Sequence, residues 1–200
     1  MFRSAVEPDA IFSQFRRETS VLHRLVESKL EPVFAELDRD RYVGLLQAFH
    51  GFIAPWEERL HQVVDAESLE FFATRRHTAR LEADLNTFAS AAPLAVADTS
   101  SCMHDTATAI GSAYVIEGSM LGGQILSRRV SASLGLTDGI GCRYFAGYAN
   151  RTGIEWRNFQ AFSEERMRQF PQSAVVSACD SARNTFGVLH DWLVHCGVVS

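Results

Sequence analysis

Apolar residues recur at intervals of three or four along nearly the whole chain, which is the spacing of one face of an α-helix. The clearest stripe consists of Phe12, Phe15, Thr19, Leu22, Val26 and Leu30, and it ends before Pro32. Alternating runs of valine, isoleucine and threonine, which indicate half-buried strands, do not occur in the sequence. The pattern therefore predicts an all-α fold.

Prolines, glycines and polar clusters divide this pattern into helical segments. After the first helix, we predict helices at about 38–64, 73–90, 103–134, 153–170 and 173–196. Asp38 is placed to cap the second of these, and Pro55 to kink it. Residues 91–101 form a predicted loop, and a turn at 137–141 precedes a short piece at 142–148. We expect residues 1–200 to form one helical domain of seven or so helices.

Two of these helices have well-defined faces. In the helix at 73–90 we expect Leu81, Leu85 and Phe88 to face inward and Arg75, Arg76, Arg80 and Glu82 to lie mostly outside. In the last helix we expect an inward stripe of Val175, Ala178, Ala182, Phe186, Leu189 and Leu193.

Composition and charge exclude several classes of protein. Hydrophobic residues make up 46% and charged residues 22% of the chain, as in globular proteins, which excludes a disordered chain. The net charge of −5 argues against a nucleic-acid-binding domain, because such domains carry a basic face. Two skews are notable: Lys29 is the only lysine among 19 basic residues, and 14 residues are phenylalanine.

Membrane, export and disulfide signals are missing from the sequence. No apolar stretch approaches the roughly 18–20 residues needed to cross a bilayer. The first residues lack an apolar core and include Glu7, so they do not resemble a secretory signal. Cys102, Cys142, Cys179 and Cys196 have neither close pairing nor metal-ligand spacing. We therefore expect reduced, mostly buried thiols in a cytoplasmic protein that binds no membrane.

His23 is the most informative histidine. It shares a helical face with Glu27, four residues later, and with Arg16, about 10 Å away along the helix axis. A metal-ligating imidazole usually donates its other N–H to a carboxylate, and Glu27 is placed to accept it. Arg16 is placed to neutralise an anionic edge of the same ligand. The same triple also fits an ordinary ion pair on a surface helix, so both interpretations remain open at this point.

Gly118, Gly122 and Gly123 interrupt the pattern of the helix at 103–134. Each glycine inside a helix costs about 1 kcal/mol relative to alanine, so something must require backbone without side chains. A close-packed partner helix is one explanation, and a large flat ligand lying on a bent helix is the other. Together with a histidine on another helix, the glycines would suit the two faces of a planar metal macrocycle such as heme.

These residues fall within segments that resemble the heme oxygenases, most closely the bacterial branch found beside bacteriophytochromes. Leu22–Glu27 resembles the proximal-ligand motif, and Tyr114–Gly123 resembles the distal helix, which is the most specific motif of the family. Other pieces resemble the family in the same order, namely Tyr42, Phe49–Phe52, Glu57, Glu58, Arg80–Leu85, Tyr144–Phe159 and Ala182–Leu193. The resemblance spans nearly the whole chain.

The resemblance implies a single helical domain with heme held between the first helix and a glycine-kinked distal helix. It implies that heme is both the substrate and the oxygen-activating centre, and is opened to biliverdin with release of CO and iron. The reaction would need O2 and electrons from an external donor such as ferredoxin, flavodoxin or their reductase. The branch implies a bacteriophytochrome as the recipient of biliverdin.

Site residues are carried over by position in the matching motifs. His23 corresponds to the iron ligand, with Glu27 as its hydrogen-bonding partner. The distal contact corresponds to Gly118, Ser119, Gly122 and Gly123, and further heme contacts to Arg16, Tyr114 and Arg157, of which the two arginines match propionate contacts.

Two positions depart from other members of the family. Ser119 stands where some members have an aspartate that holds the distal water network, and Phe49 stands where animal relatives have a tyrosine. The residue that anchors the water network therefore cannot be assigned by the resemblance.

Three other functions remain open at this stage. A heme carrier or sensor without turnover would share His23 and the glycines. A non-heme di-iron oxidase could use the Glu58-x-x-His61 spacing, although the helix would supply only one such pair. A thiaminase-like relative of the same fold would need a nucleophilic cysteine, and Cys102 falls in or beside a loop.

Overall fold

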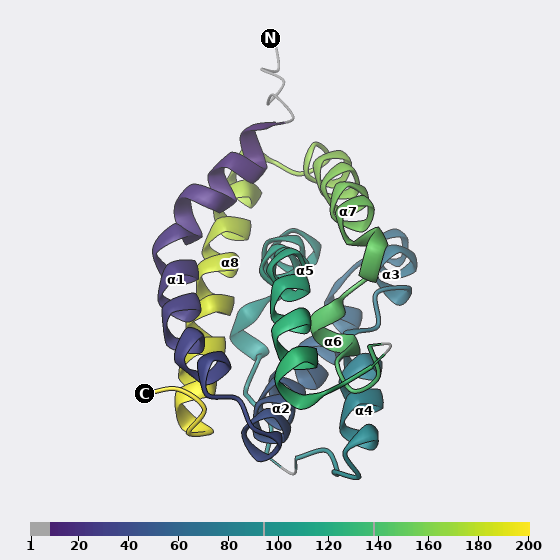
Figure 1. The fold of residues 1–200 in the computed structure, drawn as a ribbon. Coiled ribbons are helices and arrows are strands. Elements are labelled where there is room, and N and C mark those ends of the chain that lie inside the picture. Colours follow the sequence, from purple (N-terminus) through teal and green to yellow (C-terminus); the bar gives the residue numbers. More distant parts are fainter. Residues whose placement is uncertain (1–8, 94, 138) are drawn as a thin grey trace, which may run out of the picture.

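The computed structural model describes residues 9–93, 95–137 and 139–200, with side chains from residue 11 onward. Within these residues the regular structure is entirely helical, which confirms the all-α prediction (Figure 1). The helices are α1 (Asp9–Ala35), α2 (Arg39–Val63), α3 (Ala66–Ala73), α4 (His77–Thr87), α5 (Thr106–Leu134), α6 (Arg143–Ala146), α7 (Thr152–Met167) and α8 (Gln172–His195), with 3-10 turns η1 (Ser100–Cys102) and η2 (Ala149–Arg151). None of the described helices is long and apolar enough to cross a bilayer.

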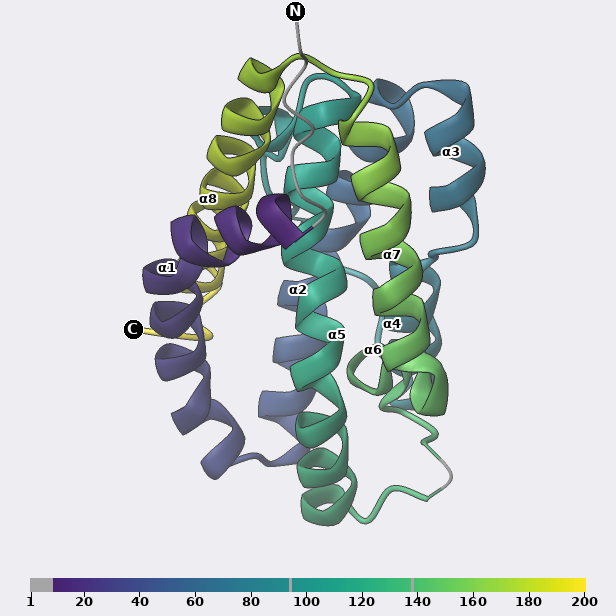
Figure 2. The ribbon, with the colours of Figure 1, turned by 90° about the horizontal axis from the view of Figure 1, so that it is seen from above.

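Helix α5 runs through the middle of the bundle, with α1 and α8 on one side and α3, α4 and α7 on the other (Figure 2). Its start is fixed by a capping box, in which the Asp105 carboxylate accepts from the Thr108 backbone N–H and the Thr108 hydroxyl accepts from the Asp105 N–H. Its most extensive packing is against α8. At Gly111 an added Cβ would lie 1.9 Å from the carbonyl oxygen of Ala178, so only glycine permits this approach of the two backbones.

Helix α1 packs along α8 and approaches α5 near its own N-terminal end (Figure 2). There the ring of Phe15 lies 5.0 Å, centroid to centroid, from Tyr114 of α5, and Phe12 lies 5.7 Å from Trp156 of α7. Further along, α1 diverges from α5 in the view of Figure 2. The last turn of α1 packs against α6, since Phe34 is 4% exposed and meets Phe145 edge-on.

Several sequence predictions hold in detail. Asp38 caps α2 by accepting from the Arg41 N–H at 2.8 Å. The whole predicted inward stripe of α8 is buried. Cys102, Cys142 and Cys179 are buried, whereas Cys196 is exposed. The prediction that the chain start is not a secretory signal concerns residues 1–8, which lie outside the described residues. Asp138, within the predicted turn at 137–141, also lies outside them.

Other predictions of element boundaries are wrong. Helix α1 continues through Pro32 to Ala35, because the proline side chain lies on the exposed face and the following turn buries Phe34. By contrast, the predicted helix at 103–134 is confirmed, because α5 runs unbroken from Thr106 to Leu134 through its three glycines.

The helix predicted at 73–90 forms as α4, with Leu81 and Leu85 buried as expected. It begins later than predicted, after a break at Thr74–Arg76, and the short helix α3 before that break was not predicted. Within the break, Arg75 was expected outside but is only 4% exposed. Its guanidinium turns inward and pairs with Glu117 of α5.

Candidate functional site

His23 has the geometry of a ligand histidine on α1. Its side chain is 53% exposed, and Nδ1 lies 3.3 Å from the Glu27 carboxylate. The ring meets Phe186 of α8 edge-on at 5.8 Å between centroids. Among the described residues, no hydrogen bond or ion pair engages Nε2. One ring nitrogen therefore lies beside a carboxylate while the other is available to a metal.

The four predicted distal residues on α5 have different surroundings. An added Cβ at Gly122 would meet nothing within 4 Å, and one at Gly118 would meet only Trp156, at 3.6 Å. At Gly123 it would lie 2.5 Å from the carbonyl oxygen of Phe145. Gly123 is thus explained by packing against α6, whereas Gly118 and Gly122 keep a side-chain-free surface that packing does not require.

The surface around Gly122 is apolar and exposed, and Gly118 beside it is half-buried. Positions 118, 122 and 125 share one helical face because they are four and seven residues apart. Ile125 is 54% exposed and the adjacent Leu121 is 43% exposed, which is high for large apolar side chains. Ser119 is exposed, and its hydroxyl donates to the Ile116 carbonyl oxygen at 2.7 Å. We call Gly118, Leu121, Gly122 and Ile125 the glycine face.

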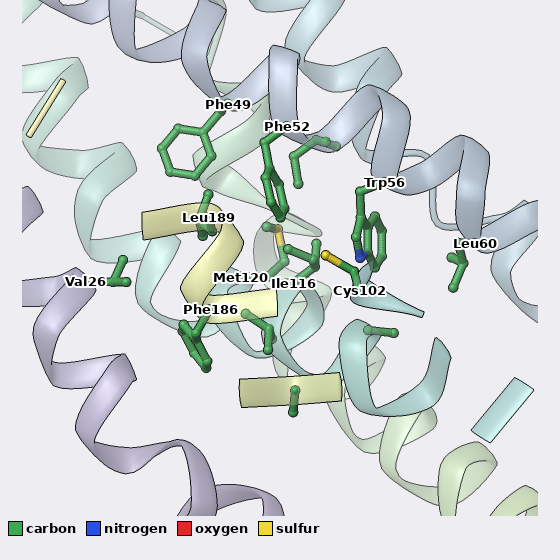
Figure 3. Close-up of a cluster of buried hydrophobic side chains, with 14 of the residues drawn as sticks. Val26, Phe49, Phe52, Trp56, Leu60, Cys102, Ile116, Met120, Phe186 and Leu189 are labelled. Atoms are coloured by element: carbon green, nitrogen blue, oxygen red, sulfur yellow. The ribbon is translucent and has the colours of Figure 1, made fainter. Parts of the chain in front are cut away.

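Apolar side chains from four helices lie in one part of the core, and one of them, Phe186, contacts His23. Figure 3 shows Val26 of α1, Phe49 of α2, Met120 of α5, and Phe186 and Leu189 of α8 around a common region. All but Met120 keep 6–8% exposure, in contrast to the fully covered Phe52 deeper in α2. The region offers an apolar lining with a histidine at its margin.

Arg16 and Tyr114 come together at the end where α1 touches α5. Burial raises the pKa of the Tyr114 hydroxyl, and both the Thr19 hydroxyl and the Arg16 charge act in the opposite direction. Arg157 is exposed on α7 beside Trp156. No hydrogen bond or ion pair in the described residues joins Arg157 to Tyr114, so only Arg16 is placed beside Tyr114.

Sequence reasoning gave no role to Glu117, which is buried on α5 directly before Gly118. Its side chain is 2% exposed, and its carboxylate lies 2.6 Å from Arg75 Nη1 and 3.0 Å from His77 Nε2. The Tyr148 hydroxyl donates to it at 3.1 Å. One signal was present in the sequence: Glu117 is the only charged residue between Thr106 and Leu126, within a helix of mostly buried residues. A charge at such a position requires buried partners.

The residues on α1 and α5 fit heme. The heme site that the resemblance implies has an axial ligand on one face, close approach of backbone on the other, and cationic groups at the propionate edge. His23 Nε2 meets the first requirement, and the open Cβ space at Gly122 meets the second. Arg16 near Tyr114 meets the third.

The other sites considered from the sequence have less support. Glu58 is exposed and accepts from Gln62, and no cluster of three or more His, Cys, Asp or Glu side chains suited to a metal occurs among the described residues. Burial raises the pKa of the Cys102 thiol to about 11, which makes it a poor nucleophile at neutral pH. The remaining cysteine thiols also have raised pKa values because of burial.

An all-helical bundle with a histidine on its first helix and a bare glycine face on its central helix has the fold of a solved heme oxygenase. A solved structure described as "Structure of Heme Oxygenase from Leptospira interrogans" superimposes with a TM-score of 0.70 over 92% of this chain and 98% of that chain. At 18% identity, this likeness shows a shared fold.

Sequence comparison gives the family. The heme oxygenase family model matches residues 9–194. A protein of Xanthomonas campestris pv. campestris (strain 8004) named heme oxygenase is 30% identical over 158 residues, covering 78% of this chain and 91% of that protein. The chain belongs to the heme oxygenase family.

Proposed function

We propose that this heme oxygenase binds heme between α1 and the glycine face of α5, with His23 Nε2 as the iron ligand. The observation that carries the proposal is that the three glycines of α5 have different surroundings. Gly123 is required by α6, but Gly118 and Gly122 are bare where no neighbouring protein atom demands it. We further propose that residues 1–200 act as one domain.

When bound, heme supplies both the iron that binds oxygen and the ring that is oxidised. Opening of the ring would yield biliverdin and CO and release the iron. In the heme complex Glu27 would accept from His23 Nδ1–H, which would keep Nε2 as the ligand nitrogen. The bare backbone at Gly118 and Gly122 lets the helix approach the ring closely. It also places no acidic or basic side chain there, so protons reach this side through water.

Heme also carries two propionates, which require cationic or hydroxyl partners. We propose Arg16 and Tyr114 for one edge, and Arg157 on the exposed surface of α7 as a further contact. Because Lys29 is the only lysine, these contacts fall to arginines, whose forked guanidinium suits carboxylates.

We propose that electrons come from a ferredoxin, a flavodoxin or their reductase, and that the chain belongs to the bacterial branch associated with bacteriophytochromes. The Glu117-Gly118-Ser119 sequence in the distal motif supports the branch assignment. Adding an apo-bacteriophytochrome to the turnover mixture should yield a photochromic holoprotein. Persistent free biliverdin in the presence of a competent apoprotein would contradict this recipient.

Turnover of the heme complex tests the function. In the presence of O2 and either ascorbate or reduced ferredoxin, we expect loss of the Soret band with one CO and one ferrozine-reactive iron per heme. His23→Ala should lose this turnover, whereas His104→Ala, at a 69% exposed histidine outside the site, should keep it. A stable ferrous heme complex that yields no CO in the wild-type protein would favour the carrier function instead.

A further inference from the structure

The segment from Phe145 to Tyr148 contacts α5 at regular intervals. The Phe145 carbonyl lies against Gly123, and a Cβ on Gly147 would lie 3.2 Å from Met120. The Tyr148 hydroxyl bonds to Glu117. Residues 117, 120 and 123 are three apart and so form one stripe of α5, distinct from the glycine face. A single short segment therefore holds the helix at both ends of its glycine-rich part.

Glu117 is the most strongly bonded residue of this stripe. Arg75, His77 and Tyr148 all bond to its carboxylate. Arg75 extends the connection to α7, where it donates to the Glu155 carbonyl oxygen at 3.1 Å. The next residue of α7, Trp156, lies beside Gly118, 3.6 Å from where a Cβ on that glycine would be. The carboxylate thus links α5 to α4 and α7 immediately beside the first distal glycine.

Glu117 is charged at neutral pH despite its burial. Burial by itself would raise the pKa of the carboxyl, but His77, Arg75 and Tyr148 together lower it below its ordinary value. Buried ion pairs add little net stability compared with apolar packing, and their best-attested use is to specify one geometry. A helix containing three glycines in six residues needs such a constraint, because glycine imposes little of its own.

We propose that Glu117 is a positioning residue that fixes the height and tilt of the glycine face over heme, and thereby determines which meso carbon is oxidised. The inference rests on the proposed heme site between α1 and α5. Glu117 itself lies on the stripe that packs against the segment from Phe145 to Tyr148, so it acts through the backbone of Gly118 and Gly122.

The first test needs no heme. Hydrogen–deuterium exchange of the apoprotein should be faster across residues 117–124 in Glu117→Gln and in Tyr148→Phe than in the wild-type protein. Arg166→Gln is the matched control, because Arg166 is buried and pairs with Asp65 and Glu67, outside the Glu117 cluster. Unchanged exchange at 117–124 in Tyr148→Phe, or an equal increase in the control, would overturn the proposal. Tyr148→Phe keeps this test decisive if Glu117→Gln does not fold.

The second test uses turnover and reads the biliverdin isomers by chromatography. In Glu117→Gln the fraction of the minor isomers should rise about tenfold relative to the wild type, equivalent to about 1.4 kcal/mol between competing geometries. Glu117→Asp, which keeps the charge, should restore part of the selectivity, and Arg166→Gln should retain the wild-type ratio. An unchanged ratio in Glu117→Gln refutes the positioning role. Failure of the wild-type protein to open heme would instead refute the proposed function.

Discussion

Replacement of Gly122 by alanine should stabilise the apoprotein and impair heme binding. An added Cβ at this position meets nothing within 4 Å, so the methyl group creates no clash in the protein. Alanine is favoured over glycine inside a helix by about 0.8–1.0 kcal/mol. For a chain of this length, that gain corresponds to an increase in Tm of roughly 2–4 °C. If heme lies against the glycine face, the same methyl group must displace it.

The cost of this displacement follows from overpacking, which is typically about 1–3 kcal/mol for one added group. That range corresponds to a loss of heme affinity of about 5- to 150-fold. Thermal unfolding of the apoprotein and titration of the Soret band measure the two effects separately.

Gly44→Ala is the matched control, because Gly44 also lies inside a helix and its Cβ would also meet nothing within 4 Å. It should raise Tm by a similar amount and leave heme affinity unchanged. The reasoning is refuted if Gly122→Ala binds and turns over heme as the control does.

Four further outcomes follow from the structure. Gly111→Ala should lower Tm sharply or prevent folding, because its methyl group would lie 1.9 Å from the Ala178 carbonyl oxygen; a Tm within 2 °C of wild type would contradict the α5–α8 packing. Arg16→Gln should weaken heme binding several-fold but leave binding of heme dimethyl ester, which has no free propionate, unaffected; equal losses for both ligands would exclude the propionate contact. Glu117→Gln should lower stability by about 3–5 kcal/mol at pH 7, where the buried pair is intact. The folded-state pKa of Glu117 lies below its ordinary 4.5, so the stability difference between the variant and wild type should shrink as the pH falls through the lowered pKa. Denaturant unfolding that shows a constant difference in the free energy of unfolding from pH 7 to 3 would contradict this prediction. A maleimide at pH 8 should label one thiol quickly in the folded protein, and Cys196→Ser should abolish that labelling, since the other three cysteines are buried.

The sequence predicts the helical bundle well because most of its helices have a local cause. Asp38 caps α2 as its residue type and position indicate, and the inward stripe of α8 follows directly from helical spacing. The break between α3 and α4 has no such local signal. It depends on Arg75 turning inward to Glu117, which lies 42 residues away in the sequence.

In the candidate site too, some features follow from local sequence spacing and others depend on distant parts of the chain. His23 and Glu27 are four residues apart on one helix, so their contact is predictable from spacing. The spacing does not show which glycine is needed for packing. Gly122 and Gly123 are neighbours in the sequence, and only the position of the Phe145 carbonyl makes Gly123 the packed one. Glu117 could be suspected from its single charge in an apolar helix, but its partners come from two distant parts of the chain, at residues 75–77 and at Tyr148.

Ligation of the heme iron by His23 is tested most directly by imidazole rescue. Ferric heme bound to the wild-type protein should show the spectrum of an axial histidine, and His23→Ala should lose it while still binding heme through the apolar lining. Added imidazole should then restore the wild-type Soret position and a measurable part of heme turnover. An unchanged ferric spectrum in His23→Ala without imidazole would contradict the proposed site.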